Sequence, residues 1–159
     1  MVSPSRGTVV RMFLVSCSEE YGKVRGYTES DQLLGAAFSR NRSNIALKDV
    51  LLKVSLLNSL YRTNIYNTFE MIEHILRIEL DSALKSGSPQ AVELLRRGHG
   101  IKRGDTELDL YSFATKYCHW HQPGLYPIYD SWVDESLAWL ACELNIRGKL
   151  RGGPLRDFT

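Results

Sequence analysis

The chain has 159 residues, a length that suggests one domain with room for a hydrophobic core. Hydrophobic residues make up 43% and charged residues 24% of the sequence, which is the balance of a globular protein and excludes a disordered one. A formal net charge of only +2 gives no argument for a nucleic-acid partner from charge alone.

The cysteine count and the hydropathy pattern predict a cytoplasmic protein. The three cysteines are an odd number without paired spacing, which argues against a disulfide framework and for a reducing compartment. The apolar run 9–15 is short, is interrupted by Arg11 and lacks a cleavage pattern. No segment approaches the roughly 20 apolar residues that cross a bilayer, so we expect no membrane partner.

The first half of the chain predicts three helices after a disordered start at residues 1–7. Segment 9–17 carries valines that suit a strand, but its apolar residues also share one helical face, and we favour a helix because no partner strands follow. Thr28 or Ser30 caps a short second helix. Residues 45–62 have a wide apolar arc, typical of a central helix packed on more than one side.

The second half predicts further helices separated by loops. Residues 68–84 have helical spacing up to Gly87, and Ser88-Pro89 has the pattern of a helix start. Residues 98–105 (GHGIKRGD) read as a loop, with a phosphate-cradling turn as the less favoured alternative.

Two capping-box patterns complete the prediction. Thr106 with Asp109 opens the next helix, which ends before Pro123-Gly124, and Ser131 with Asp134 opens the last one. The result is an all-α fold, a single compact multi-helix domain over residues 8–146, with six or seven helices and a basic, Gly-rich tail at 147–159.

Lys116 and Asp130 are the residues best suited to chemistry. On a helix, Lys116 neighbours Ser112, His119 and Trp120, and partial burial there would lower the pKa of the amine and free its lone pair for Schiff-base chemistry. A carboxylate that caps a helix, as predicted for Asp130, is held ionised and fixed in direction. The alternatives are a lysine whose stem covers apolar surface and an ordinary helix cap.

Other side chains near this pair have both a structural and a functional interpretation. The aromatic residues of this region could hold a flipped base or fill the seam between two helices; they are Trp120, Tyr126, Tyr129 and Trp132. Cys118, His119 and His121 do not have metal-ligand spacing on a helix, so we expect no metal. Nothing in the sequence predicts a cofactor.

Basic residues cluster at one place before the lysine. Arg96, Arg97, Lys102 and Arg103 could contact the phosphates of double-stranded DNA, although solvated loop charges are the commoner case.

The segment SFATKYCHWHQPGLYPIYDSWV (residues 112–133) resembles a module of uncharacterised bacterial proteins that look like distant 8-oxoguanine DNA glycosylases, members of the helix-hairpin-helix glycosylase superfamily. The likeness extends over residues 45–140. It implies an all-α fold, with Lys116 at the position of the catalytic lysine and Asp130, after Pro127 and Ile128, at that of the catalytic aspartate.

Two functional hypotheses follow. In the first, the resemblance implies a divergent glycosylase and AP lyase that flips a damaged base toward Trp120, Tyr129 and His119, attacks with Lys116 and stabilises positive charge with Asp130. In the second, the chain is a non-catalytic helical binding or interaction module that keeps the scaffold. The second is motivated by residues 110–114, which occupy the place of the superfamily's hairpin and contain no glycine.

Overall fold

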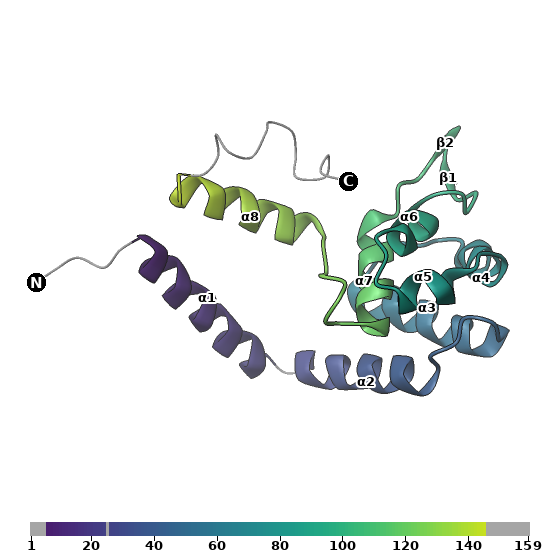
Figure 1. Cartoon of the computed structure of the whole chain (residues 1–159), viewed down its shortest axis with the longest axis horizontal. Helices are drawn as coiled ribbons and strands as arrows, with labels where there is room; N and C mark the ends of the chain where they lie inside the picture. Colours follow the sequence, from purple (N-terminus) through teal and green to yellow (C-terminus); the bar gives the residue numbers. More distant parts are fainter. Residues whose placement is uncertain (1–5, 25, 146–159) are drawn as a thin grey trace, which may run out of the picture. The chain divides into compact units, whose positions relative to one another are not determined.

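A computed structural model describes residues 6–24 and 26–145 of the chain (Figure 1). Backbone contacts divide the chain into two compact units. One unit comprises residues 30–129, and the other comprises residues 1–29 together with 130–159. Because this division describes contacts and not folding behaviour, the single domain predicted over residues 8–146 stays a prediction.

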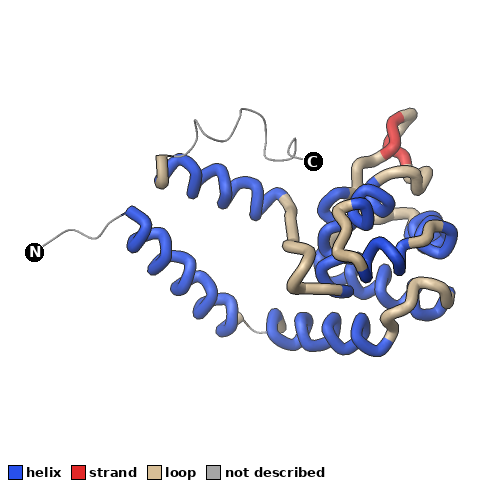
Figure 2. The backbone as a smooth tube through the Cα atoms, viewed as in Figure 1, coloured by secondary structure: helices blue, strands red, loops and turns tan. Residues whose placement is uncertain are grey.

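The described residues form eight helices and one short β-hairpin, drawn in red in Figure 2. The elements in chain order are α1 (Arg6–Lys23), α2 (Tyr27–Arg40), α3 (Leu47–Tyr61), α4 (Thr68–Arg77), α5 (Leu80–Lys85), α6 (Gln90–Arg96), β1 (Lys102–Arg103), β2 (Thr106–Glu107), α7 (Tyr111–His121) and α8 (Ser131–Glu143). The predicted helical class is therefore confirmed, with a small antiparallel hairpin in addition.

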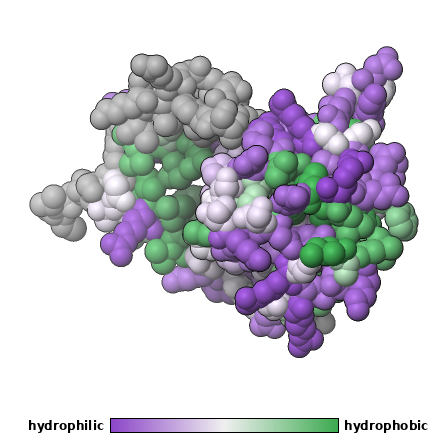
Figure 3. All heavy atoms as spheres, turned by 45° about the vertical axis from the view of Figure 1, so that its right-hand side comes forward, coloured by the Kyte–Doolittle hydropathy of each residue, from purple (hydrophilic) through white to green (hydrophobic). Residues whose placement is uncertain are grey.

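The core of the 30–129 unit is built around α3. Val50, Val54 and Leu57 lie on one face of this helix and are fully buried, where α3 packs against α4 and α7. Burial of each such side chain stabilises the fold by roughly 1.5–3 kcal/mol. The central position predicted for this helix is confirmed. Outside the core, Figure 3 shows hydrophilic residues mixed with smaller hydrophobic areas, as on most globular proteins.

The single helix predicted over residues 68–84 is wrong, because the chain breaks after α4. Ile78 has extended dihedral angles, and its N–H closes the last turn of α4 on the carbonyl of His74. The chain then turns into α5, where both Leu80 and Leu84 are buried. A continuous helix would not direct the same residues into the core, so burial accounts for the break.

The capping box predicted at Thr106 is wrong, and the loop predicted at residues 98–105 is confirmed except for Lys102 and Arg103, which form a short strand. Lys102 pairs with Glu107 and Arg103 with Thr106 in an antiparallel hairpin. Gly104 occupies the turn with φ +61°, a conformation that glycine adopts without strain. Helix α7 begins only at Tyr111. Asp109 therefore caps no helix, and its carboxylate binds an arginine instead, as described below.

The unit made of the chain's two end segments contains α1 and α8. Phe13 of α1 and Trp139 of α8 have ring centroids 5.2 Å apart. The helix favoured over a strand for residues 9–17 is confirmed as α1, which begins at Arg6 and so includes two residues of the expected disordered start. Residues 1–5 and the predicted basic tail 147–159 lie outside the described residues.

Helix α8 starts with the cap predicted from its sequence, one residue earlier than the capping box places it. The carboxylate of Asp130 accepts a 3.1 Å hydrogen bond from the N–H of Val133, so Asp130 and not Ser131 is the cap. Among the described helices, none is both long enough and apolar enough to cross a bilayer.

Candidate functional site

Lys116 lies on α7 and is buried, with 4% of its surface exposed. Its Nζ donates a 2.8 Å hydrogen bond to the hydroxyl of Ser112, one turn earlier on the same helix. The ammonium group also lies 5.1 Å from the centroid of the Tyr61 ring, at the end of α3. The partial burial considered in the sequence analysis is therefore nearly complete burial, and the amine contacts side chains of two helices.

The residue before this lysine connects α7 to the chain that follows it. Thr115 accepts a 3.2 Å hydrogen bond from the N–H of Tyr129, and its hydroxyl lies 2.9 Å from the carbonyl oxygen of Tyr129. One threonine side chain thus binds both backbone groups of one distant residue. Tyr129 immediately precedes Asp130, with which the other unit resumes.

The predicted substrate-binding residues have structural contacts within the 30–129 unit. His119 donates from Nδ1 to the carbonyl of Tyr126 at 2.7 Å, and the Tyr129 ring packs edge-on against Tyr111 at 5.5 Å. Trp120 lies 3.8 Å from the position that a Cβ would take on Gly35. Its indole Nε1 is the only buried side-chain N or O atom among the described residues without a hydrogen-bond partner. A donor left unsatisfied in this way costs stability.

The four predicted phosphate-binding residues fall into two groups. Arg97, Lys102 and Arg103 are exposed, the last two on the hairpin. Arg96 is buried, and its Nε donates to Asp109 at 2.9 Å while its second nitrogen also binds this carboxylate. It further binds Glu93 and stacks over the Tyr111 ring. The hydrogen bond from Arg96 lowers the pKa of Asp109. The guanidinium of Arg96 is therefore bound by side chains of the protein itself in this structure.

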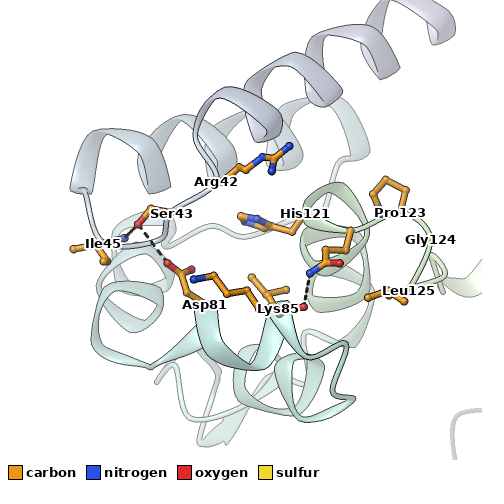
Figure 4. Close-up of a pocket in the computed structure, with 11 residues that line it drawn as sticks. Arg42, Ser43, Ile45, Asp81, Lys85, His121, Pro123, Gly124 and Leu125 are labelled. Carbon is orange, nitrogen blue, oxygen red and sulfur yellow. Dashed lines mark hydrogen bonds between the residues drawn. The ribbon is translucent and has the colours of Figure 1, made fainter.

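A cavity of about 710 Å³ lies elsewhere in the 30–129 unit, at the far end of α7 (Figure 4). Its lining comes from the loop after α2, from α5 and from the turn after α7. The lining residues are Arg42, Ser43, Ile45, Asp81, Leu84, Lys85, His121, Gln122, Pro123, Gly124 and Leu125. Lys116 is not among them.

Behind this cavity lies a second lysine, which the sequence analysis did not single out. Lys53 of α3 is fully buried, and its ammonium group donates to the carbonyls of Asn41 and Ser43 at 2.9 Å each. A third bond, of 2.6 Å, goes to Oδ1 of Asn44. Burial lowers the pKa of Lys53 to about 8, against the opposing effect of Asp81. At neutral pH the group is charged and its three donors are used.

Asp81 and His121 complete this polar cluster. The Asp81 carboxylate accepts hydrogen bonds from the backbone N–H of Asn44, from its side-chain amide and from the Ser43 hydroxyl. His121 places Nε2 3.4 Å from the Lys53 nitrogen. Burial, with the charge of Lys53 next, lowers the pKa of His121 to about 3. The imidazole is therefore neutral, and because the three Lys53 donors bind Asn41, Ser43 and Asn44, Nε2 can at most share one of them.

A signal for Lys53 exists in the sequence. It falls three residues after Val50 and four before Leu57, on the apolar face of α3. A lysine in such a place must find buried acceptors. The acceptors come from the loop at residues 41–44, and local spacing does not predict that this loop folds back onto α3.

The described residues contain no group of three or more His, Cys, Asp or Glu side chains arranged to hold a metal ion. The thiol of Cys118 is buried in the core, which raises its pKa to about 12 and makes it a poor ligand or nucleophile at neutral pH.

The comparisons with known proteins give the class of this mostly helical domain. A family model for the HI_0787 N-terminal domain matches residues 11–125, and the chain belongs to this family. It is similar to an uncharacterized protein of Haemophilus influenzae, with 42% identity over 94 residues. That match covers 58% of this chain and 45% of the relative, so it spans less than half of the relative's length. No solved structure matches the chain.

Proposed function

We propose that this protein is a divergent DNA glycosylase and AP lyase that acts on a damaged base flipped out of double-stranded DNA. Lys116 is its nucleophile, and Asp130 stabilises the positive charge that develops on the sugar. The observation that carries the proposal is the Thr115 clamp on Tyr129, which attaches the residue before Asp130 to the residue before Lys116. Both residues of this contact lie within the 30–129 unit, so it holds the backbone that leads into Asp130 against the helix that carries Lys116.

The surroundings of the amine support its role. The Lys116 nitrogen is withdrawn from water and is oriented by the Ser112 hydroxyl, which accepts a hydrogen bond from it. Once the amine is neutral, its lone pair forms a bond to the sugar C1′, and the glycosidic bond breaks with its electron pair leaving on the base, which takes up a proton. The nitrogen lone pair then forms a C=N bond to C1′ while O4′ leaves with its electron pair and takes up a proton from water, which opens the sugar ring and gives a protonated Schiff base. Because the amine is buried against the Tyr61 ring, this ring must move before DNA can reach Lys116.

Borohydride trapping on a duplex that contains 8-oxoguanine tests the proposal. Borohydride reduces the Schiff base to a stable amine, so the wild-type protein should give a covalent protein–DNA adduct. Lys116→Ala should abolish the adduct, while Lys48→Ala, which removes an exposed lysine outside the predicted DNA-binding residues, should retain it. An adduct that is undiminished in Lys116→Ala, or no adduct with the wild-type protein, contradicts the assignment.

A second candidate function is a non-catalytic helical binding module. The cavity favours it, because this space does not include Lys116 and none of the predicted substrate-binding residues lines it. In this case Lys116→Gln leaves the biological activity intact, and affinity for duplex DNA is negligible at physiological salt. A steep salt-dependent DNA affinity would contradict this candidate.

A further inference from the structure

We propose that the cavity at the far end of α7 binds a small phosphate ester, with the phosphate between Arg42 and Lys85 and the organic part against the apolar wall. Figure 4 shows both side chains with His121 around one space. This site is separate from Lys116, so it does not depend on the glycosylase proposal. All of its lining lies within residues 11–125, the segment that the family model matches.

The charges around the cavity favour an anion. Arg42, from the loop after α2, and Lys85, from α5, are both exposed, and within the described part of the chain neither forms an ion pair. A guanidinium binds two phosphate oxygens at once, and a lysine supplies a mobile point charge. Asp81 is the only carboxylate in the lining, so the cations outnumber it. The buried charge of Lys53 adds to this excess.

The wall that carries Arg42 is held in place before any ligand arrives. The carbonyls of Asn41 and Ser43, on either side of Arg42, both accept hydrogen bonds from Lys53. Asp81 binds the next residue, Asn44, through its backbone and its side chain. Because these bonds fix the backbone at residues 41–44, little conformational entropy of the loop is lost when a ligand binds. The same bonds also occupy the Asp81 carboxylate and reduce its repulsion of an anion.

The remaining lining selects a phosphate that carries an organic body. Ile45, Leu84 and Leu125 give the cavity an apolar side that a free inorganic ion would leave unused. The volume of about 710 Å³ lies within the roughly 300–1,000 Å³ typical of small-molecule sites. A mononucleotide and a sugar phosphate share the required chemistry, and they differ in whether a planar apolar base is present.

Calorimetric titration of the full chain tests this proposal, with adenosine monophosphate, glucose 6-phosphate and inorganic phosphate as probes at low ionic strength. At least one ester should bind more tightly than inorganic phosphate. Arg42→Gln and Lys85→Gln should each weaken ester binding by roughly 10- to 100-fold, which is the effect of removing a charge-assisted hydrogen bond. Tighter binding of the nucleotide would assign the apolar wall to a base, and tighter binding of glucose 6-phosphate would assign the site to sugar phosphates.

Two matched variants serve as controls. Arg40→Gln and Lys48→Gln remove exposed cations that lie near in sequence to the site but do not line the cavity. They should leave ester affinity unchanged. The proposal is overturned if neither ester binds more tightly than inorganic phosphate, or if the control variants weaken binding as much as Arg42→Gln and Lys85→Gln. Because Arg42 and Lys85 are exposed, their variants should keep the wild-type fold.

Discussion

The side-chain oxygen of Asn44 accepts two 2.6 Å hydrogen bonds, one from the ammonium group of Lys53 and one from the hydroxyl of Tyr117. A single amide oxygen thus joins α3, α7 and the loop that precedes α3. All three side chains are buried, where a hydrogen bond to a charged donor is stronger than in water. The loop that forms one wall of the cavity is therefore attached to the centre of the core.

Replacement of Lys53 by Met tests this attachment. The change keeps the side-chain volume but removes the donors that satisfy the carbonyls of Asn41 and Ser43. We expect the free energy of unfolding to fall by about 2–4 kcal/mol, since buried acceptors then lack partners. Urea unfolding measures the loss, with exposed Lys48→Met as the control at less than about 0.5 kcal/mol. Equal stability of the two variants would mean that the Lys53 ammonium does not anchor the loop.

The lowered pKa of His121 predicts how the free energy of unfolding depends on pH. Its pKa in the folded protein is about 3, against 6.5 for an unperturbed histidine, so the unfolded chain binds more protons between these values. The free energy of unfolding should therefore fall as the pH drops below about 6.5, by up to about 1.4 kcal/mol per pH unit for this one group. Burial lowers the pKa of His74 too, so His74 adds to the loss in the same direction.

Unfolding measured from about pH 7 to about pH 5 separates the histidines from the carboxylates, which titrate lower. His121→Gln should flatten the decline over this range, and His74→Gln should flatten it separately. Lys53 and Asp81 face His121, and Lys53, with a pKa of about 8, stays mostly charged in this window. A decline that is as steep in His121→Gln as in the wild type would show that this imidazole is not kept neutral by the fold.

The sequence predicts those features that depend on local spacing. Helix α3 follows from its apolar arc, and the capping role of Asp130 follows from the chemistry of a carboxylate at a helix start. What local spacing cannot predict are contacts between distant segments. Lys53 and Asn44 meet because a loop folds back, and Asp109 meets Arg96 because a hairpin lies between them. The capping-box prediction assigned Asp109 to a helix start because the spacing fits, whereas the buried guanidinium of Arg96 provides a stronger partner.

The Arg96–Asp109 pair gives the last prediction. Arg96 is buried and binds Asp109 through two nitrogens, while its bond to Glu93 joins neighbours on one helix turn. Asp109→Asn should therefore lower the free energy of unfolding by about 1–3 kcal/mol, because it leaves a buried guanidinium with weaker compensation. Glu93→Gln should cost only about 0.3–0.5 kcal/mol, because Glu93 is itself exposed and contacts Arg96 through one nitrogen.

A double-mutant cycle with Arg96→Met isolates the pair from the packing of the arginine stem. The pH dependence adds a second measure. Arg96 lowers the pKa of Asp109, so the stabilisation is present above about pH 3.8 and is lost as the pH falls through the lowered value. In Asp109→Asn, this decrease in the free energy of unfolding at low pH should disappear. A coupling free energy near zero would mean that Arg96 is held by the Tyr111 ring and Glu93 instead.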